Sequence, residues 1–196
     1  MTAYALIADL KRYLDIPVAN VIDDDLLTMF LDNASAIIDT ETHRTFAAAA
    51  DTTVPHDAIK DVEGRRLWLR GDLAQPPTTI TNGDGATIAL SAIVYEPGIG
   101  GQPSYALTLK GSSGVSWTYD DDPEASIAIV GRWAYSVAPP APIKQVTLRL
   151  AAWLYRQRDN ALDLDRTVIV GTSVLTPAAI PVDVMTILRP YLKRLP

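Results

Sequence analysis

The segment 126–160 constrains the fold more than any other part of the chain, because it holds a strand pattern, a proline corner and a helix pattern in succession. Residues 126–133 alternate and are rich in Ile and Val, which predicts a strand. Three prolines in residues 136–142 prevent either regular structure from continuing through the corner. From residue 143 to 158 the pattern is helical, and Pro142 is tolerated in the first turn because an N–H there would have no partner.

The predicted helix 143–158 is apolar on most of its sides. Its main stripe and the residues that widen it are Ile143, Val146, Leu148, Leu150, Ala151, Ala152, Trp153, Leu154 and Tyr155. Only Gln145, Arg149 and Arg156 form a narrow polar ridge. A helix that is apolar on most sides is normally surrounded by other elements. We therefore expect this helix to lie at the centre of a helical bundle.

Composition favours a packed protein assembled in a reducing compartment. The chain has 196 residues, of which 48% are hydrophobic and 20% charged, so a sizeable core can form. It has no cysteine, which excludes disulfides, a thiolate nucleophile and thiolate-bound metal. No apolar run approaches the roughly 20 residues that a membrane span needs. We expect a soluble, unexported protein that does not bind membranes.

Charge is distributed unevenly along the chain. The net charge is −6, whereas sequence-independent binding of duplex DNA requires a basic surface. Residues 1–50 are strongly acidic, and residues 143–196 carry twice as many basic as acidic side chains. An acidic front and a basic back can pair within one molecule, or between copies stacked head to tail.

The N-terminal 50 residues predict two helices. The first spans 3–14, with Thr2 as its cap and Leu6, Ile7, Leu10 and Leu14 on one face. The second begins at three consecutive aspartates, which suit a helix N-terminus, and runs to about residue 44. On it, Asp25, Asp32 and Asp39 recur every seven residues. This acidic ridge is either a solvated face or a surface matched to Arg149 and Arg156 in the same or a neighbouring subunit.

The middle of the chain predicts a β domain inserted between helices. Residues 47–55 have the composition of a linker, and about six short strands follow between residues 65 and 135. The sequence Asn-Gly-Asp-Gly at 82–85 predicts a tight turn. The predicted fold class is α+β: a bundle of about four helices with an inserted antiparallel sandwich or barrel-like domain. The predicted domains are 1–50, 51–138 and 139–196, and the other predicted strands are 65–69, 88–95, 105–110 and 115–119.

The C-terminal part predicts an arm and a last helix. Residues 160–179 lack an amphipathic period, so we expect an extended arm in which 167–170 can pair as a strand. A helix starts at Pro181, and Pro190 should kink or restrict it. Lys193 and Arg194 would lie in its last turn, where they suit the helix dipole. Its apolar stripe comprises Val184, Ile187, Leu188, Tyr191, Leu192 and Leu195.

The sequence offers little chemistry, and we predict no catalytic residue, metal or cofactor. His56 and Asp57 lack a third ligand at usable spacing, and the aspartates at 120–122 suit either calcium or a solvated turn. Trp117 and Tyr119, with two later aromatics, form either a ligand platform or core. A hydrolase would require convergent acids beside a cleft, for which the candidates are Asp57, Asp61 and Glu63.

Three quoted segments carry a resemblance to a known family. They are LKRYLDI followed by DDDLLTMFLDNASAIIDTETHRTF, then VGRWAYSVAPPAPIKQVTLRLAAWLYRQRD, and last PVDVMTILRPYLKR. In this order they resemble the head–tail connector (adaptor) proteins of tailed bacteriophages and prophages. The resemblance covers both ends of the chain, and the β region from 78 to 114 has no counterpart in it.

The resemblance implies a structural protein of the virion neck, assembled in the cytoplasm of a bacterial host. Such proteins form a ring, dodecameric in the family, beneath the portal protein. They extend a channel that DNA passes without specific binding, and they meet a stopper or tail-completion protein. The alternatives are a stopper or tail-completion protein itself, or a virion protein whose β domain binds host or carbohydrate. The candidate subunit or portal interface comprises Arg149, Arg156, Arg166, Thr167, Val168, Ile169, Val170, Lys193 and Arg194.

Overall fold

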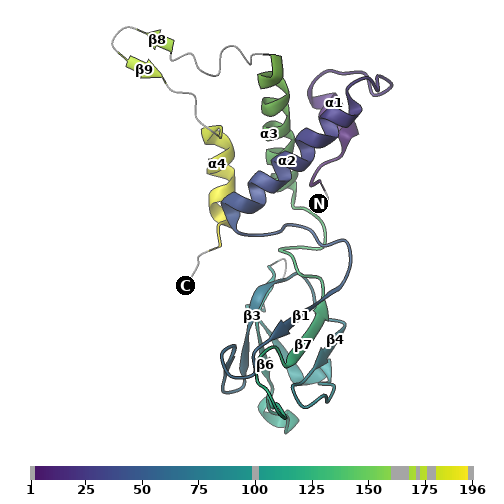
Figure 1. Cartoon of the computed structure of the whole chain (residues 1–196), viewed down its shortest axis with the longest axis vertical. Coiled ribbons are helices and arrows are strands. Elements are labelled where there is room, and N and C mark those ends of the chain that lie inside the picture. Colours follow the sequence, from purple (N-terminus) through teal and green to yellow (C-terminus); the bar gives the residue numbers. More distant parts are fainter. Residues whose placement is uncertain (1–2, 99–101, 160–167, 171–172, 176–179, 194–196) are drawn as a thin grey trace. The chain divides into compact units, whose positions relative to one another are not determined.

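The computed structural model describes residues 3–98, 102–159, 168–170, 173–175 and 180–193. The chain divides into two compact units. One, the helical unit, combines Met1–Arg44 with Pro139–Pro196, and the other, the β unit, comprises Thr45–Ala138 (Figure 1).

The helical unit contains α1 (Ile7–Tyr13), α2 (Asp24–Thr42), α3 (Ala141–Asp159) and α4 (Val182–Leu188). Helix α3 contacts each of the other three, and α2 also packs on α1. The prediction of a central helix at 143–158 is therefore confirmed. The same contacts confirm the expected helical bundle among the residues that the structure describes.

The core of the helical unit follows the predicted stripes. Ile143, Val146 and Leu150 of α3 are fully buried, as are Leu27 and Leu31 of α2. Burial of large aliphatic side chains contributes about 1.5–3 kcal/mol each, so these contacts account for much of the stability of the unit. Trp153 of α3 is only half-buried, because it lies at the edge of a groove described below.

The predicted start of the first helix is wrong, whereas the expected restriction of the last helix by Pro190 is confirmed. The first helix begins at Ile7 instead of residue 3, so Leu6 flanks it and is 69% exposed. The last α-helix ends at Leu188 and changes to a 3-10 turn at Arg189–Tyr191, because Pro190 cannot donate the next helical hydrogen bond. Two predictions for this end are wrong as a result: Leu192 leaves the apolar stripe and is 40% exposed, and Lys193 lies beyond the last helical turn. The expected cap Thr2 and the stripe residue Leu195 lie outside the described residues.

A short antiparallel hairpin forms within the predicted arm. Its strands are β8 (Val168–Val170) and β9 (Ser173–Leu175), with Val168 opposite Leu175. This confirms that part of the arm pairs as a strand.

The β unit contains two antiparallel sheets. One has the order β1-β7-β4 and the other β2-β3-β6-β5. The fold is therefore α+β, as expected, and the described residues do not form a closed barrel. The strands are β1 (Thr52–His56), β2 (Val62–Glu63), β3 (Arg66–Leu73), β4 (Thr79–Thr81), β5 (Ile93–Glu96), β6 (Ser104–Leu109) and β7 (Ile127–Gly131).

Both sheets contribute side chains to one hydrophobic core. Leu67 of β3 and Leu107 of β6 come from the four-stranded sheet, and Ile80 of β4 and Ile129 of β7 come from the other. All four are fully buried. Trp117, from the loop before β7, joins the same core.

The structure differs from the prediction at three places in the β unit. Residues 51–55 are not a linker, because Thr52–His56 pairs with β7 as an edge strand, where Pro55 is tolerated. Residues 115–119 form no strand. The strand expected at 88–95 is shortened to Ile93–Glu96 by a preceding 3-10 turn. The turn at 82–85 is confirmed, since the Gly85 N–H donates to the Asn82 carbonyl oxygen at 3.0 Å.

Candidate functional site

A groove of about 220 Å³ runs along α3 between α1 and α4. We call it the α3 groove. Its walls combine aromatic rings from α1 and α3 with charged side chains from α3 and α4. It is lined by Tyr13, Arg149, Ala152, Trp153, Arg156, Pro181, Asp183 and Val184.

The two predicted arginines of α3 both line this groove, but they differ in their partners. Arg149 forms an ion pair with Asp183 in the first turn of α4. Arg156, seven residues further along α3, is exposed. Because Asp183 neutralises only Arg149, the groove retains the positive charge of Arg156. The sequence indicated the shared side of Arg149 and Arg156, whereas the Asp183 partner depends on how α4 packs.

The three aspartates of the predicted acidic ridge on α2 have different surroundings. The Asp39 carboxylate accepts a hydrogen bond from the Tyr4 hydroxyl at 2.5 Å, and burial raises the Asp39 pKa above its usual value despite this bond. Asp25 is exposed and Asp32 is half-buried. Within the described part of the chain, no ion pair joins this ridge to Arg149 or Arg156, so matching between copies stays a prediction.

Other acids at the start of α2 stabilise the helical unit internally. The ammonium of buried Lys11 lies 2.6 Å from an Asp24 oxygen and also donates to the Val18 carbonyl oxygen. The Tyr155 hydroxyl of α3 donates to Asp23 at 2.9 Å. These bonds fasten α1 and α3 to the N-terminal end of α2.

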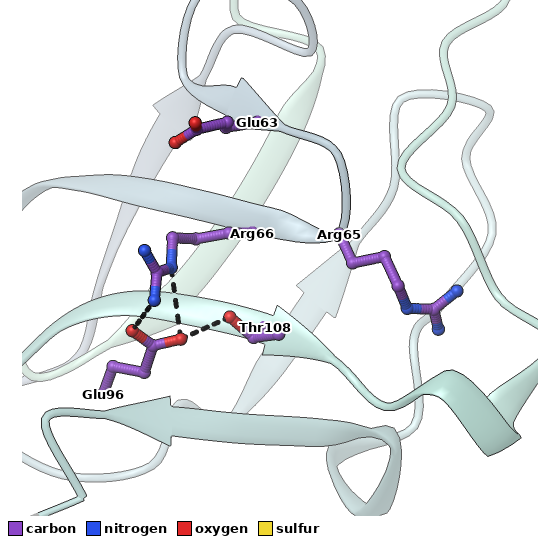
Figure 2. A pocket seen from close by; sticks show the side chains of 5 residues that line it. All are labelled: Glu63, Arg65, Arg66, Glu96 and Thr108. Atoms are coloured by element: carbon purple, nitrogen blue, oxygen red, sulfur yellow. Dashed lines mark hydrogen bonds and ion pairs between the residues drawn. The ribbon is translucent and has the colours of Figure 1, made fainter.

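A second candidate surface is a shallow cleft of about 320 Å³ on the four-stranded sheet of the β unit. Figure 2 shows Arg66 of β3 reaching Glu96 of β5, with Thr108 of β6 on the other side of that carboxylate. The Thr108 hydroxyl lies 2.5 Å from Glu96 Oε1, and this bond, followed by Arg66, holds the pKa of Glu96 below its usual value. Glu63 and Arg65 complete the lining, so the two acidic and two basic side chains balance in charge.

Two exposed aromatic rings adjoin this cleft. Trp68 is 40% exposed and Tyr105 is 45% exposed, and their nearly parallel rings have centroids 6.0 Å apart. The Arg66 guanidinium lies 4.9 Å from the centre of the Trp68 ring. We call Arg66, Trp68 and Tyr105 the stacked cluster. Trp, Tyr and Arg are the residue types that contribute most binding energy at protein interfaces.

The aromatic platform suggested by the sequence does not form. Trp117 is buried, and its indole N–H donates to the Arg65 carbonyl oxygen at 3.0 Å. Tyr119 is 41% exposed. The core interpretation of Trp117 is thus confirmed, and its burial argues against a carbohydrate platform made with Tyr119.

The acids considered for hydrolysis have structural roles instead. Asp57 is buried and its Oδ1 accepts the backbone N–H groups of Ile59 and Lys60, each at 2.8 Å. These bonds, the Lys60 amide first, lower the pKa of Asp57. Asp61 accepts the N–H of Asp57 and pairs with Arg70. Because these carboxylates are occupied by backbone and guanidinium donors, they do not converge on the cleft that Glu63 lines.

His56 is also structural. Its Nε2 lies 3.2 Å from the Arg70 backbone N–H and accepts from it, so Nδ1 carries the proton and donates to the Val54 carbonyl oxygen. Burial lowers the pKa of His56. Within the described ranges, no three His, Asp or Glu residues are grouped as a metal site would require.

The remaining predicted interface residues are only partly described. Val168, Ile169 and Val170 form β8, while Arg166, Thr167 and Arg194 lie outside the described residues. Lys193 follows the last helical turn, and its backbone N–H donates to the Thr42 carbonyl oxygen at 2.9 Å. No helix in the described part of the chain is long and apolar enough to span a membrane.

No family model matches the chain, and a search of curated proteins finds no similar sequence. Solved structures do match over the whole chain. A chain from the neck of an empty gene transfer agent (GTA) particle, computed with C6 symmetry, has a TM-score of 0.58 at 17% identity, covering 100% of this chain and 95% of that one.

Two further structures agree with this match. A chain from the neck of a native GTA particle, computed with C12 symmetry, has a TM-score of 0.57 at 17% identity, covering 100% of this chain and 94% of that one. A chain from the virion of a native GTA particle has a TM-score of 0.57 at 16% identity, covering 98% and 91%. At these identities the similarity shows a shared fold.

Proposed function

We propose that this protein is a structural component of the neck of a bacteriophage-like particle. In this role, copies form a ring under the portal protein, extend the DNA channel and join head to tail. The observation that carries the proposal is the fold similarity to GTA neck chains over the full length of both units. The resemblance of the terminal segments to phage head–tail connectors supports the same role independently of the fold.

Charge supports a channel along which DNA slides without specific binding. The net charge is −6, and tight contact with phosphates would require a basic surface instead. The site chemistry supports a structural role rather than a catalytic one, because the buried acids and His56 are occupied by backbone and arginine contacts. We place the protein in the virion neck after assembly in the host cytoplasm.

We further propose that the β8–β9 hairpin docks on the portal or on a neighbouring copy. A two-stranded hairpin is at best marginally stable alone in water. Its strand sequences, Val-Ile-Val and Ser-Val-Leu, are mostly apolar, so burial against a partner would stabilise them. Arg166 and Thr167 directly precede this hairpin in the sequence. We assign them to the same contact, together with Lys193 and Arg194.

The stacked cluster is our candidate contact for a stopper or tail-completion protein. It combines two exposed aromatic rings with an arginine on paired strands, where the rings already stack and the guanidinium already lies over one of them, which favours binding without a large ordering cost. A ring at the neck has to present such a surface to the next component.

The proposal is tested by co-producing the protein with the portal protein of the same particle and imaging the purified product by electron microscopy. We expect a ring of additional density under the portal with the rotational symmetry of a neck. Portals that stay bare at saturating protein concentration would contradict the proposal. A variant that lacks residues 166–177 tests the hairpin separately: rings that form with wild-type yield would refute docking by the hairpin.

A further inference from the structure

We propose that the α3 groove binds the acidic side of α2 from a second copy of this chain, so that neighbouring copies join head to tail. Here the acidic side of α2 means Asp25 and Asp32. The inference rests on the proposed ring function and names the two surfaces that would meet in the ring.

The two helices have opposite charge. Helix α2 contains five acidic residues and no basic one. Helix α3 contains four basic residues and one acid. At physiological salt, exposed charges further apart than about 8 Å are largely screened, so this difference stabilises an assembly only where the helices touch.

Each helix already uses its apolar face inside its own subunit. Leu27 and Leu31 of α2 and Leu150 of α3 are buried in the helical unit. Two acids of α2 are also engaged there, because Asp24 pairs with Lys11 and Asp39 accepts from Tyr4. Asp25 is exposed, Asp32 is half-buried, and within the described ranges neither takes part in an ion pair. The acidic side of α2 is therefore left for an outside partner.

The α3 groove has the complementary properties. Arg149 is held in place by Asp183, whereas Arg156 is exposed and carries the remaining positive charge of the lining. Trp153 and Tyr13 supply aromatic walls, and Tyr13 is 47% exposed. An open groove that offers one guanidinium beside aromatic rings can bind a protein helix whose facing side carries only a few acidic residues. Duplex DNA would instead require a row of basic residues on a positive surface.

The arrangement also leads to a closed assembly. The groove and the acidic side of α2 are different surfaces, so the contact is heterologous, and such contacts generate rings when the rotation closes. Every copy then uses its groove for one neighbour and its α2 for the other.

Charge reversal with a mixing step tests the inference. We would prepare Asp25→Lys, Arg156→Glu and the double variant, and measure ring formation on the portal by electron microscopy and sedimentation. Each single variant should lose at least about tenfold in ring yield, because a like-charged contact recurs at every junction. The double variant should recover, and so should a 1:1 mixture of the single variants, because alternating copies restore opposite charges at every junction.

The control variants carry the same charge changes elsewhere. Asp120→Lys lies in an exposed loop of the β unit and Arg189→Glu lies at the exposed end of α4, and both should assemble as wild type does. Circular dichroism melts establish that each variant folds.

The outcomes separate this inference from the proposed function. If wild type forms rings and the single reversals form them equally well, the inference is overturned and the ring function stands. It is also overturned if the reversals abolish rings but neither the mixture nor the double variant recovers, since the two surfaces would then not face each other. If wild type forms no rings on portals, both proposals are overturned.

Discussion

The two units of this chain differ in whether their charged side chains have partners within the same unit. In the β unit, the arginines bond within the unit: Arg66 to Glu96, Arg70 to Asp61, and Arg132 to Asp51 and nearby carbonyl oxygens. In the helical unit, Arg156, Asp25 and Asp32 remain available while their apolar neighbours are buried. These arginines of the β unit thus have their partners within the unit, whereas the helical unit leaves complementary charges on α2 and α3 that a further copy can satisfy.

The source of stability differs in the same way. The β unit depends on pairing between distant segments, for example Thr52 of β1 with Gly131 of β7. The helical unit depends on local helices whose apolar stripes meet along α3. The following predictions test whether the units differ as described, beginning with the largest expected effect.

Truncating one core leucine in each unit should have the largest effect. Leu107→Ala in β6 and Leu150→Ala in α3 each remove a fully buried side chain, and we expect a loss of about 2–5 kcal/mol in the unfolding free energy of the altered unit. Hydrogen exchange followed by mass spectrometry assigns the loss to a unit. If either change weakens protection of both units equally, the chain unfolds as one body and the comparison fails.

Adding a methyl group at Gly83 should destabilise the β unit by about 1–3 kcal/mol. A Cβ at this position would lie 2.5 Å from the Thr118 carbonyl oxygen and 2.7 Å from the Ser126 hydroxyl, so the backbone has to shift. The matched control is Gly111→Ala, where no atom lies within 4 Å of the added group. Urea unfolding of Gly83→Ala and Gly111→Ala should separate the two, and equal midpoints would show that the turn adapts without cost.

These two regions also explain which features of the fold could be predicted. The apolar residues of helices α2 and α3 recur with the helical period, so the sequence predicts both helices. Only their ends depend on local details, such as the left-handed φ of +53° at His43, which ends α2. Strand β1 was mistaken for a linker, because its sequence lacks an alternating pattern and its identity comes from pairing with β7. The segment with Trp117 has the alternation of a strand but forms none. The Trp117 ring is positioned instead by a hydrogen bond to the distant Arg65 carbonyl oxygen, which leaves no local signal in the sequence.

The candidate sites show the same limit. Arg149 and Arg156 share one side of a helix, which a spacing of seven residues predicts. The partner of Arg149 on α4 arises from packing and has no local signal. The stacked cluster was missed because Trp68 and Tyr105 meet across β3 and β6 next to a register shift between Trp68 and Leu73.

Acid should weaken the β unit through His56. Burial lowers the folded-state pKa of this imidazole, so its contribution to stability is present above the unfolded value near 6.5 and is lost as pH falls through the folded value. Carboxyl groups with lowered pKa values, such as Glu96, reduce the unfolding free energy only when the pH falls below about 4.5. We expect a decline in unfolding free energy between about pH 6.5 and 4.5, measured by urea titration.

The two histidines of the chain provide the control for this decline. His56→Gln should flatten the pH dependence in that interval, because no buried imidazole remains to be protonated. His43→Gln changes an exposed side chain and should leave the decline as in wild type. A decline that persists in His56→Gln would assign it to other groups.

The smallest effect should come from Asp183→Asn in the helical unit. Both side chains of the ion pair with Arg149 are partly exposed to solvent, with 37% and 44% accessible, although the pairing Asp183 oxygen is covered, and such surface pairs contribute about 0.2–1 kcal/mol. Asp183 also lies in the first turn of α4, where a negative charge favours the helix N-terminus. The loss in unfolding free energy should therefore stay below about 1 kcal/mol and shrink further in 1 M NaCl. Asp15→Asn, at an exposed position with φ of +58° that Asn also tolerates, is the matched control. A salt-independent loss of about 2 kcal/mol or more would mean that the pair is desolvated, and Arg149 would then be satisfied within its unit as firmly as the paired arginines of the β unit are.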